Sequence, residues 1–358
     1  MESAAPPNFA ASPFVTMSAI DSASRTIVVL GATGQQGSGV VQHLLERTSF
    51  SVVALSRSTT STAATRLSNM YKRYDGRFEI KQANVLDAES LRKAFEGAYG
   101  LFAVTQYSAP LQTEEDMRFE LTGGRNIIDA AKATEIKHLI YSGLPSVSAA
   151  TSNRFMHIWH FEYKAQVEDY AKEVLASSST AFTILHAQLF FRNLAWPHYA
   201  KVNDQDGALE FRAVLGEKKV QSWTDPCYDV GLFASELFLL GPSITHGKTY
   251  PVGGSPLSLS DLASTYTRVT GLPARVKPTS LADWTSAVVA SQGPGIEQDI
   301  GEMVQFFDWE GTLEQGGSDY GAMGKEEYEE RMKELGGRVR ASTSRSFSSD
   351  RHFSLRGE

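Results

Sequence analysis

The chain has 358 residues, of which 42% are hydrophobic and 21% are charged, and its formal net charge is -7 at pH 7. This composition is typical of a soluble globular protein with one large domain and a smaller lobe, and it excludes a chain that is disordered throughout. The net negative charge provides no basic surface for nucleic acid. Because helix-turn-helix, zinc-finger and RNA-binding motifs are also missing, we expect no direct contact with nucleic acid.

Cysteine content and apolar runs bear on the cellular compartment. Cys227 is the only cysteine, which excludes an intrachain disulfide and a multi-cysteine metal site and fits a reducing compartment. No run of 18 apolar residues predicts a membrane helix, so we expect no membrane association. Residues 1–25 lack the basic start and compact apolar core of a signal peptide and are predicted to be a flexible leader. The expected location is the cytoplasm, with the nucleus left open.

The first half of the chain alternates short β-branched runs with helical patterns. Thr26–Leu30 is apolar and ends at a glycine, as a buried parallel strand does, and the segment 36–47 carries one apolar face. Further strands are predicted at 51–55, 78–80, 101–105, 138–142 and 182–185, and helices around 67–70 and at 88–97, 114–133 and 158–175. This alternation predicts an α/β fold built on a doubly wound parallel sheet of the Rossmann type.

The second half is predicted to form a smaller C-terminal lobe. We assign 26–192 to the Rossmann domain and 193–335 to a substrate or partner lobe, with a strand at 247–252 returning to the main sheet. Helices are expected at 232–240 and from 260 to 270, the first preceded by a capping loop. Residues 336–358 are rich in Ser and Arg and poor in apolar residues, which predicts a disordered tail that either meets an acidic partner or is only solvated.

A glycine-rich turn follows the first predicted strand and opens a helix. It reads Gly31-Ala32-Thr33-Gly34-Gln35-Gln36-Gly37. The first glycine suits a tight turn, the second lets a phosphate approach the backbone, and the third lets the helix pack on the sheet. Backbone N–H groups and the helix dipole converge at such a turn, which therefore predicts a dinucleotide pyrophosphate site.

Arg57 stands where the adenosine ribose should be read, about twenty residues beyond the last glycine. An acidic residue at this place binds the 2′-hydroxyl of NAD, whereas a guanidinium binds the 2′-phosphate of NADP. The sequence therefore favours NADP(H) over NAD(H). The alternative is a surface arginine paired with a neighbouring carboxylate.

Taken in order, several segments resemble the NmrA-like branch of the atypical short-chain dehydrogenase/reductase superfamily, from about Arg25 to Glu314. They are GATGQQG at 31–37, ALSRS at 54–58, AVTQY at 103–107, YSGL at 141–144, HFEYKAQVEDY at 160–170, FFRN at 190–193 and QFFDW at 305–309. The resemblance implies a Rossmann fold that binds NADP(H). The contacts it implies are made by Thr33, Gln35, Gln36, Arg57, Asn84, Val85, Thr105, Gln106, Tyr107, Lys164, Phe190, Phe191, Arg192 and Asn193.

Some of these positions also have plain structural interpretations. Residues 84–87 could form a turn in which Asp87 caps the next helix, and Thr105 could simply end its strand. Their place at strand ends favours ligand contact, since ligands bind outside the carboxyl ends of strands in such sheets.

The catalytic residues are less clear from the sequence. The resemblance implies a Tyr-x-x-x-Lys arrangement in relatives that reduce carbonyls, in which the tyrosine donates a proton. Here His160 stands at the tyrosine position, four residues before Lys164, and Tyr163 lies on another helix face. Three interpretations stay open: Lys164 holds the nicotinamide ribose while His160 donates a proton, the protein only binds cofactor, or His160 is a core histidine. Ser142 could polarise a carbonyl oxygen or only hydrogen-bond the loop.

Two classes of function survive. The first is an NADP(H)-dependent oxidoreductase acting on a small organic substrate, with a role in a specialised metabolic pathway left open. The second, which some NmrA-like proteins resemble, is a non-catalytic sensor of the NADPH/NADP ratio that regulates a transcription factor or another protein partner. We predict no metal site, because His157 and His160 have no third ligand nearby. The sequence leaves homodimerisation open.

Overall fold

The computed structural model describes residues 25–105, 110–216, 219–254, 256–310 and 325–335. Residues 1–24 of the predicted leader (1–25), the predicted tail at 336–358, and Gln106 and Tyr107 lie outside the described residues. Within the described part, no helix combines the length and the apolar character needed to cross a membrane.

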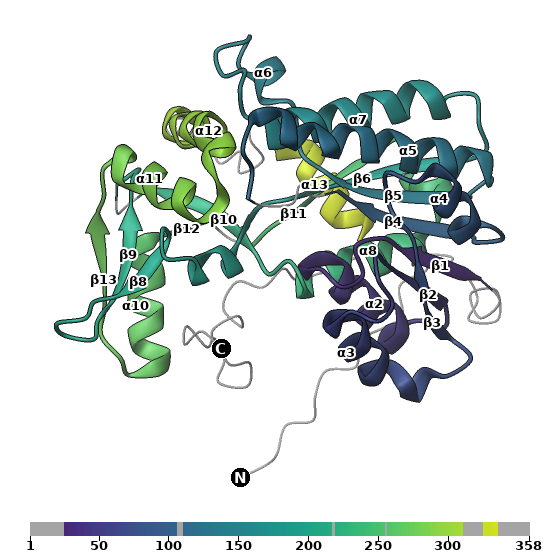
Figure 1. Ribbon diagram of the computed structural model, residues 1–358, viewed down its shortest axis with the longest axis horizontal. Helices are drawn as coiled ribbons and strands as arrows, with labels where there is room; N and C mark the ends of the chain where they lie inside the picture. The colour runs from purple at the N-terminus through teal and green to yellow at the C-terminus, as the bar shows by residue number, and fades with distance from the viewer. Residues whose placement is uncertain (1–24, 106–109, 217–218, 255, 311–324, 336–358) are drawn as a thin grey trace.

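A seven-stranded parallel sheet forms the centre of the fold (Figure 1). Its strands run in the order β11-β6-β5-β4-β1-β2-β3, so that the order reverses beside β1. The strands are β1 (Thr26–Val29), β2 (Ser51–Ser56), β3 (Phe78–Gln82), β4 (Gly100–Val104), β5 (His138–Gly143), β6 (Ala181–Ala187) and β11 (Thr249–Val252). All neighbours pair in parallel. The predicted Rossmann-type sheet is confirmed.

Successive residues of a strand point to opposite faces of the sheet, so buried apolar strands present an apolar surface on both faces. Helices cover both of these faces. Ile27 and Val29 belong to one core and Val28 and Leu30 to the other. The first core is closed by α2 (Gln35–Arg47), α3 (Thr62–Tyr71) and α8 (Tyr228–Leu240), and the second by α4 (Ala88–Phe95), α5 (Phe119–Ala133) and α7 (Trp159–Leu175). The helix predicted at 114–133 is divided, since a 3-10 turn, η2 (Glu114–Arg118), precedes α5.

The C-terminal lobe is more regular than its sequence indicates. It holds two three-stranded sheets, β12-β10-β7 and β13-β9-β8 (Figure 1, left). Their strands are β7 (Leu189–Phe190), β8 (Ala200–Val202), β9 (Leu209–Ala213), β10 (Val220–Thr224), β12 (Pro256–Ser258) and β13 (Ala274–Pro278). The lobe's helices are η3 (Phe191–Ala195), α10 (Leu259–Thr270), α11 (Leu281–Gln292), η4 (Pro294–Ile296) and α12 (Glu297–Glu310). Shorter turns are η1 (Lys72–Tyr74), α6 (Val147–Ala150) and α9 (Pro242–Thr245).

Segments from the second half of the chain also return to the main sheet. Helix α8 packs against α2, β11 forms the outermost strand beside β6, and α13 (Lys325–Glu334) lies against β11. Tyr250 Oη donates a hydrogen bond of 2.7 Å to Glu334 Oε2, and Lys248 pairs with the same carboxylate. Residues 193–335 therefore contribute to both parts of the molecule.

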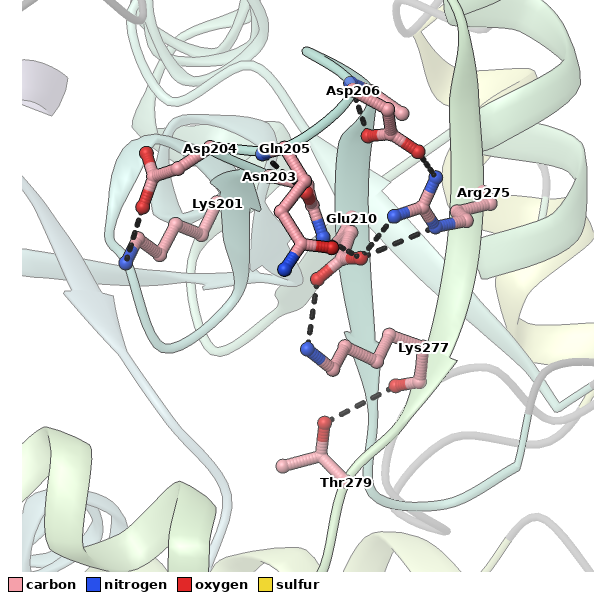
Figure 2. A network of polar contacts seen from close by, with 10 residues as sticks. Lys201, Asn203, Asp204, Gln205, Asp206, Glu210, Arg275, Lys277 and Thr279 are labelled. Carbon is pink, nitrogen blue, oxygen red and sulfur yellow. Dashed lines mark hydrogen bonds and ion pairs between the residues drawn. The ribbon is translucent and has the colours of Figure 1, made fainter.

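A polar network joins β9 and β13 in the lobe, and Figure 2 shows Glu210 at its centre. Lys277 Nζ donates to Glu210 Oε2 at 2.9 Å, and Asn203 and Arg275 donate to Oε1 at 2.9 and 2.5 Å. The hydrogen bonds from Lys277 and then Asn203 lower the pKa of Glu210 to about 2. The carboxylate therefore stays ionised near neutral pH and keeps the three donors together.

Two glycines allow α2 and α8 to approach backbone to backbone. A Cβ added at Gly39 would collide with the carbonyl oxygen of Cys227, and one at Gly231 would collide with the carbonyl of Gly39. We expect Gly39→Ala to lower the free energy of unfolding by about 1 to 3 kcal/mol, because the helices must separate. Urea denaturation of the purified variant measures this change.

Gly301→Ala is the matched control. Gly301 lies within α12, and an added Cβ there meets no atom within 4 Å. Removing a helical glycine should stabilise the protein by about 0.5 to 1 kcal/mol. Equal effects at both positions would contradict the close approach of α2 and α8.

Candidate functional site

The glycine turn occupies the carboxyl end of β1, where the strand order reverses. Gly31 has a φ of 74°, a left-handed conformation that favours glycine, and its carbonyl accepts a 2.8 Å hydrogen bond from the Gly34 N–H. A Cβ on Gly37 would collide with the same Gly31 carbonyl. Both glycines are therefore required for the turn to fold tightly into the helix.

The first turn of α2 is open to an anion. Its N-cap, Gly34, supplies no side-chain hydrogen bond, and the first turn contains no acidic residue. The N–H groups of residues 35–37 have no acceptor within the helix, and the positive end of the helix dipole lies there. A diphosphate would satisfy these donors, so the turn fits a dinucleotide.

One cleft of about 480 Å³ runs from this turn to the C-terminal lobe. It connects the carboxyl ends of β1, β2, β4 and β5 with α7, α11 and α12. Among the predicted cofactor residues, those that line it are Gly31, Thr33, Gly34, Gln35, Gln36, Gly37, Arg57, Val85, Thr105, Lys164, Phe190 and Asn193. The structure thus brings together residues predicted from six separate segments of the sequence.

Arg57 follows β2 directly and lines the cleft with an exposed side chain. Ser56 Oγ donates to the Ser58 carbonyl at 2.8 Å, which shapes the turn around it. Within the described ranges the Arg57 guanidinium has no hydrogen-bond or ion-pair partner. The carboxylate partner required by the plain surface interpretation is therefore not found among those residues.

Of the predicted cofactor residues that the structure describes, four do not line the cleft. Ala32 is buried beneath the turn, and Asn84 accepts a hydrogen bond from the Leu86 N–H in a turn that leads to the capping residue Asp87. Phe191 is buried and stacks on Trp223, with ring centroids 5.6 Å apart. Arg192 is exposed outside the cleft lining. The turn at 84–87 and the cap at Asp87 are therefore present, as the structural interpretation of this segment predicts.

Lys164, on α7, donates three hydrogen bonds to two residues, Glu120 and Thr105. Its Nζ donates to Glu120 Oε1 at 2.6 Å, to the Thr105 carbonyl at 2.5 Å and to Thr105 Oγ1 at 3.2 Å. The Glu120 side chain is 1% exposed, and its Oε2 has no partner among the described residues. Both residues line the cleft, so a buried ion pair lies at its wall.

Ser142, at the end of β5, also lines the cleft. Its hydroxyl donates a 2.6 Å hydrogen bond to Gln36 Oε1 in the glycine turn. The bond connects the carboxyl end of β5 to the first turn of α2. Ser142 thereby fixes the Gln36 side chain beside the anion site.

His160 lies one turn before Lys164 on α7 and also lines the cleft. Its Nδ1 donates to Asp299 Oδ2 at 2.6 Å, and its backbone N–H donates to Asp299 Oδ1 at 3.0 Å. One turn earlier, His157 Nδ1 donates to Glu302 Oε1 at 2.5 Å. Both histidines are therefore engaged with carboxylates of α12, and the described residues contain no group of three potential metal ligands.

Sequence reasoning missed several residues of the cleft. Asp299, Glu120, His198 and Trp284 all line it, and none belongs to a motif. One signal was available, because Asp299 and Glu302 have the same three-residue spacing as His157 and His160. Burial lowers the pKa of His198 to about 4, with a smaller effect of Arg212, so this imidazole is neutral at physiological pH.

Removing Lys164 separates its structural role from any chemical one. We expect Lys164→Met to lower the free energy of unfolding by about 3 to 5 kcal/mol, because the buried Glu120 carboxylate loses its counterion. In the double variant Lys164→Met with Glu120→Leu, most of this loss should disappear. Urea unfolding of Lys164→Met, Glu120→Leu and the double variant measures the coupling, and single losses that simply add in the double variant would argue against a structural ion pair.

Comparison with known proteins gives relatives over most of the chain. The NmrA-like family domain-containing oxidoreductase hkm9 of Aspergillus hancockii is 28% identical over 270 residues, which are 73% of this chain and 76% of that protein. The corresponding oxidoreductase cpsB of Aspergillus campestris is 29% identical, over 70% of this chain and 75% of its own.

Solved structures share the fold at lower identity. NmrA, a negative transcriptional regulator solved in complex with NADP, has a TM-score of 0.66 and 19% identity, over 91% of this chain and 95% of its own. The triphenylmethane reductase of Citrobacter sp., complexed with NADP(H), has a TM-score of 0.61 and 19% identity, over 86% and 99%. The model of the NmrA-like family matches residues 23–333. The resemblance found in the sequence is thus confirmed, and the chain belongs to the NmrA-like family.

Proposed function

We propose that this protein is an NADP(H)-dependent oxidoreductase that acts on a small, uncharged organic substrate. The observation that carries the proposal is one cleft that joins the glycine turn, an arginine without a partner among the described residues, a histidine and an apolar chamber. Relatives named as oxidoreductases and fold neighbours solved with NADP or NADP(H) support it.

The cofactor would lie along the carboxyl edge of the sheet. The N–H groups at the start of α2 would hold the diphosphate, and Arg57 would hold the 2′-phosphate. The Lys164–Glu120 ion pair, which lines this edge of the cleft, would lie beside the cofactor. Bound NADPH would supply the hydride.

Residues 26–192 would then serve mainly the cofactor and residues 193–335 mainly the substrate, apart from α8, β11 and α13, which return to the main sheet. The chamber beyond Lys164 is lined from the lobe by Trp196, Tyr199, Trp284, Val288, Ile300, Met303 and Phe307. His198 also lines the cleft, and it is neutral near pH 7 because burial lowers its pKa to about 4. These walls favour an apolar, aromatic-rich substrate, because they offer no counterion to a charged one.

His160 is the residue we propose as proton donor to the substrate. It occupies the position one turn before Lys164 that tyrosine holds in the arrangement described above, and its imidazole is 21% exposed toward the cleft. Imidazole exchanges protons near neutral pH, so it can replace a phenol in this role. Ser142 would act by holding Gln36 rather than by touching the substrate.

Arg57→Gln tests the cofactor assignment. We expect the dissociation constant of NADPH to rise about ten- to a hundredfold, because one charge-assisted contact is lost, while that of NADH stays unchanged. Fluorescence titration with each nucleotide measures this. Arg66→Gln, an exposed arginine on α3 outside the cleft, controls for the overall change of charge. An equal loss of affinity for both nucleotides would contradict a 2′-phosphate contact.

NADPH oxidation tests the reaction itself. We expect the purified protein to consume NADPH with at least one member of a panel of apolar quinones, imines and enones, followed at the nicotinamide absorbance band. His160→Gln should lower the rate about a hundredfold or more, because general acid catalysis is lost. Tight NADPH binding without consumption, together with NADPH-dependent capture of a defined protein partner, would instead indicate a sensor.

A further inference from the structure

Asp299 is a fully buried carboxylate at the junction of the two parts of the molecule. It lies on α12 of the C-terminal lobe, has no exposed surface, and lines the cleft beside His160. Each oxygen has one donor on α7: Oδ1 accepts from the His160 backbone N–H at 3.0 Å, and Oδ2 accepts from Nδ1 at 2.6 Å. The carboxylate therefore fixes both the backbone and the ring of the same residue.

This geometry selects one tautomer of His160. A carboxylate can only accept, so Nδ1 must carry the proton, whether the ring is neutral or charged. The opposite nitrogen, Nε2, has no hydrogen-bond partner among the described residues, and the ring lines the cleft. Nε2 is thus the atom left to exchange a proton with a bound substrate.

We propose that Asp299 is a positioning residue for proton transfer by His160, so that the C-terminal lobe completes the reactive site. This rests on the oxidoreductase function proposed above. In reduction, the substrate's C=O or C=N carbon takes the hydride of NADPH, and its heteroatom takes the proton from Nε2. The imidazolium becomes a neutral ring protonated at Nδ1, the form that Asp299 stabilises, and a proton from water restores it.

A purely structural role for Asp299 would make it no more than a cap for the start of α7. The neighbouring pair provides the comparison, because Glu302 Oε2 accepts from the backbone N–H groups of Met156 and His157 at 2.9 and 2.8 Å, and Oε1 accepts from the His157 ring. His157 and Glu302 do not line the cleft. Each carboxylate thus caps backbone N–H groups near the start of α7 and binds a histidine ring. Only the ring bound by Asp299, that of His160, lines the cleft.

Asp299→Asn is the decisive variant, since the side-chain carbonyl can still accept from the backbone N–H. Its NH₂ group would face Nδ1, which must then act as acceptor, so the neutral ring should carry its proton on Nε2. Long-range proton–nitrogen NMR of histidine-labelled protein, with the His160 signals identified by their loss in His160→Gln, reports this tautomer without cofactor or substrate. We expect the Nδ1–H form in the native chain and the Nε2–H form in Asp299→Asn.

Kinetics with NADPH and an active acceptor from the panel complete the test. We expect Asp299→Asn to lower kcat about a hundredfold or more with little change in KM, because proton transfer is lost and binding is kept. Glu302→Gln should leave kcat unchanged. Unaltered kcat in Asp299→Asn, an unchanged tautomer, or equal losses in both variants would overturn the proposal. If the native chain oxidises no NADPH with any acceptor, the oxidoreductase function itself fails. The NMR measurement needs no cofactor or substrate, so it still shows whether Asp299 sets the tautomer of His160, and the two failures can be told apart.

Discussion

The close packing of the α2 backbone determines where the glycine turn points. Gly37 lies against the Gly31 carbonyl at the start of the helix, and Gly39 lies against the Cys227 carbonyl at the start of α8. Side chains at these places would push the helix away from the sheet. Because α2 is held on both sides, its uncapped first turn stays at the carboxyl edge of β1. Arg57, Lys164 and His160 line the same cleft as this turn, so a ligand bound at the turn would lie within the cleft that these three residues line.

Charge changes along the cleft in a way that matches this geometry. At one end the Arg57 guanidinium is exposed and has no partner in the described part of the chain, so it is available to a phosphate. In the middle, Lys164 is matched by the buried Glu120, and the neutral His198 lies in the chamber beyond. An anion is therefore attracted to the turn, while the far chamber suits an uncharged group.

The parts of the site that the sequence predicts are those built from neighbouring residues. The strand, turn and helix around Gly31 to Gly37 form a local pattern, and Arg57 follows at a fixed distance. Long-range partners leave no such pattern: Asp299 is 139 residues from His160, and Gln36 is 106 residues from Ser142. The small lobe sheets have a mixed pattern. A strand as short as β7, with two residues, shows no periodicity, whereas β9 (LEFRA) and β13 (ARVKP) alternate apolar and polar residues, a signal that the sequence analysis did not use.

In the proposed function, helix α12 links substrate recognition to proton transfer. Asp299, Ile300, Met303 and Phe307 lie on one face of this helix, and all line the cleft. The same element therefore holds the ring of His160 and shapes the chamber for the substrate. A shift of α12 that enlarged the chamber would also move the Asp299 carboxylate away from Nδ1, where a 2.6 Å bond leaves little room. Under the proposed function, substrate size and acid orientation are thus coupled through one helix, and the lobe would constrain the chemistry as well as the choice of substrate.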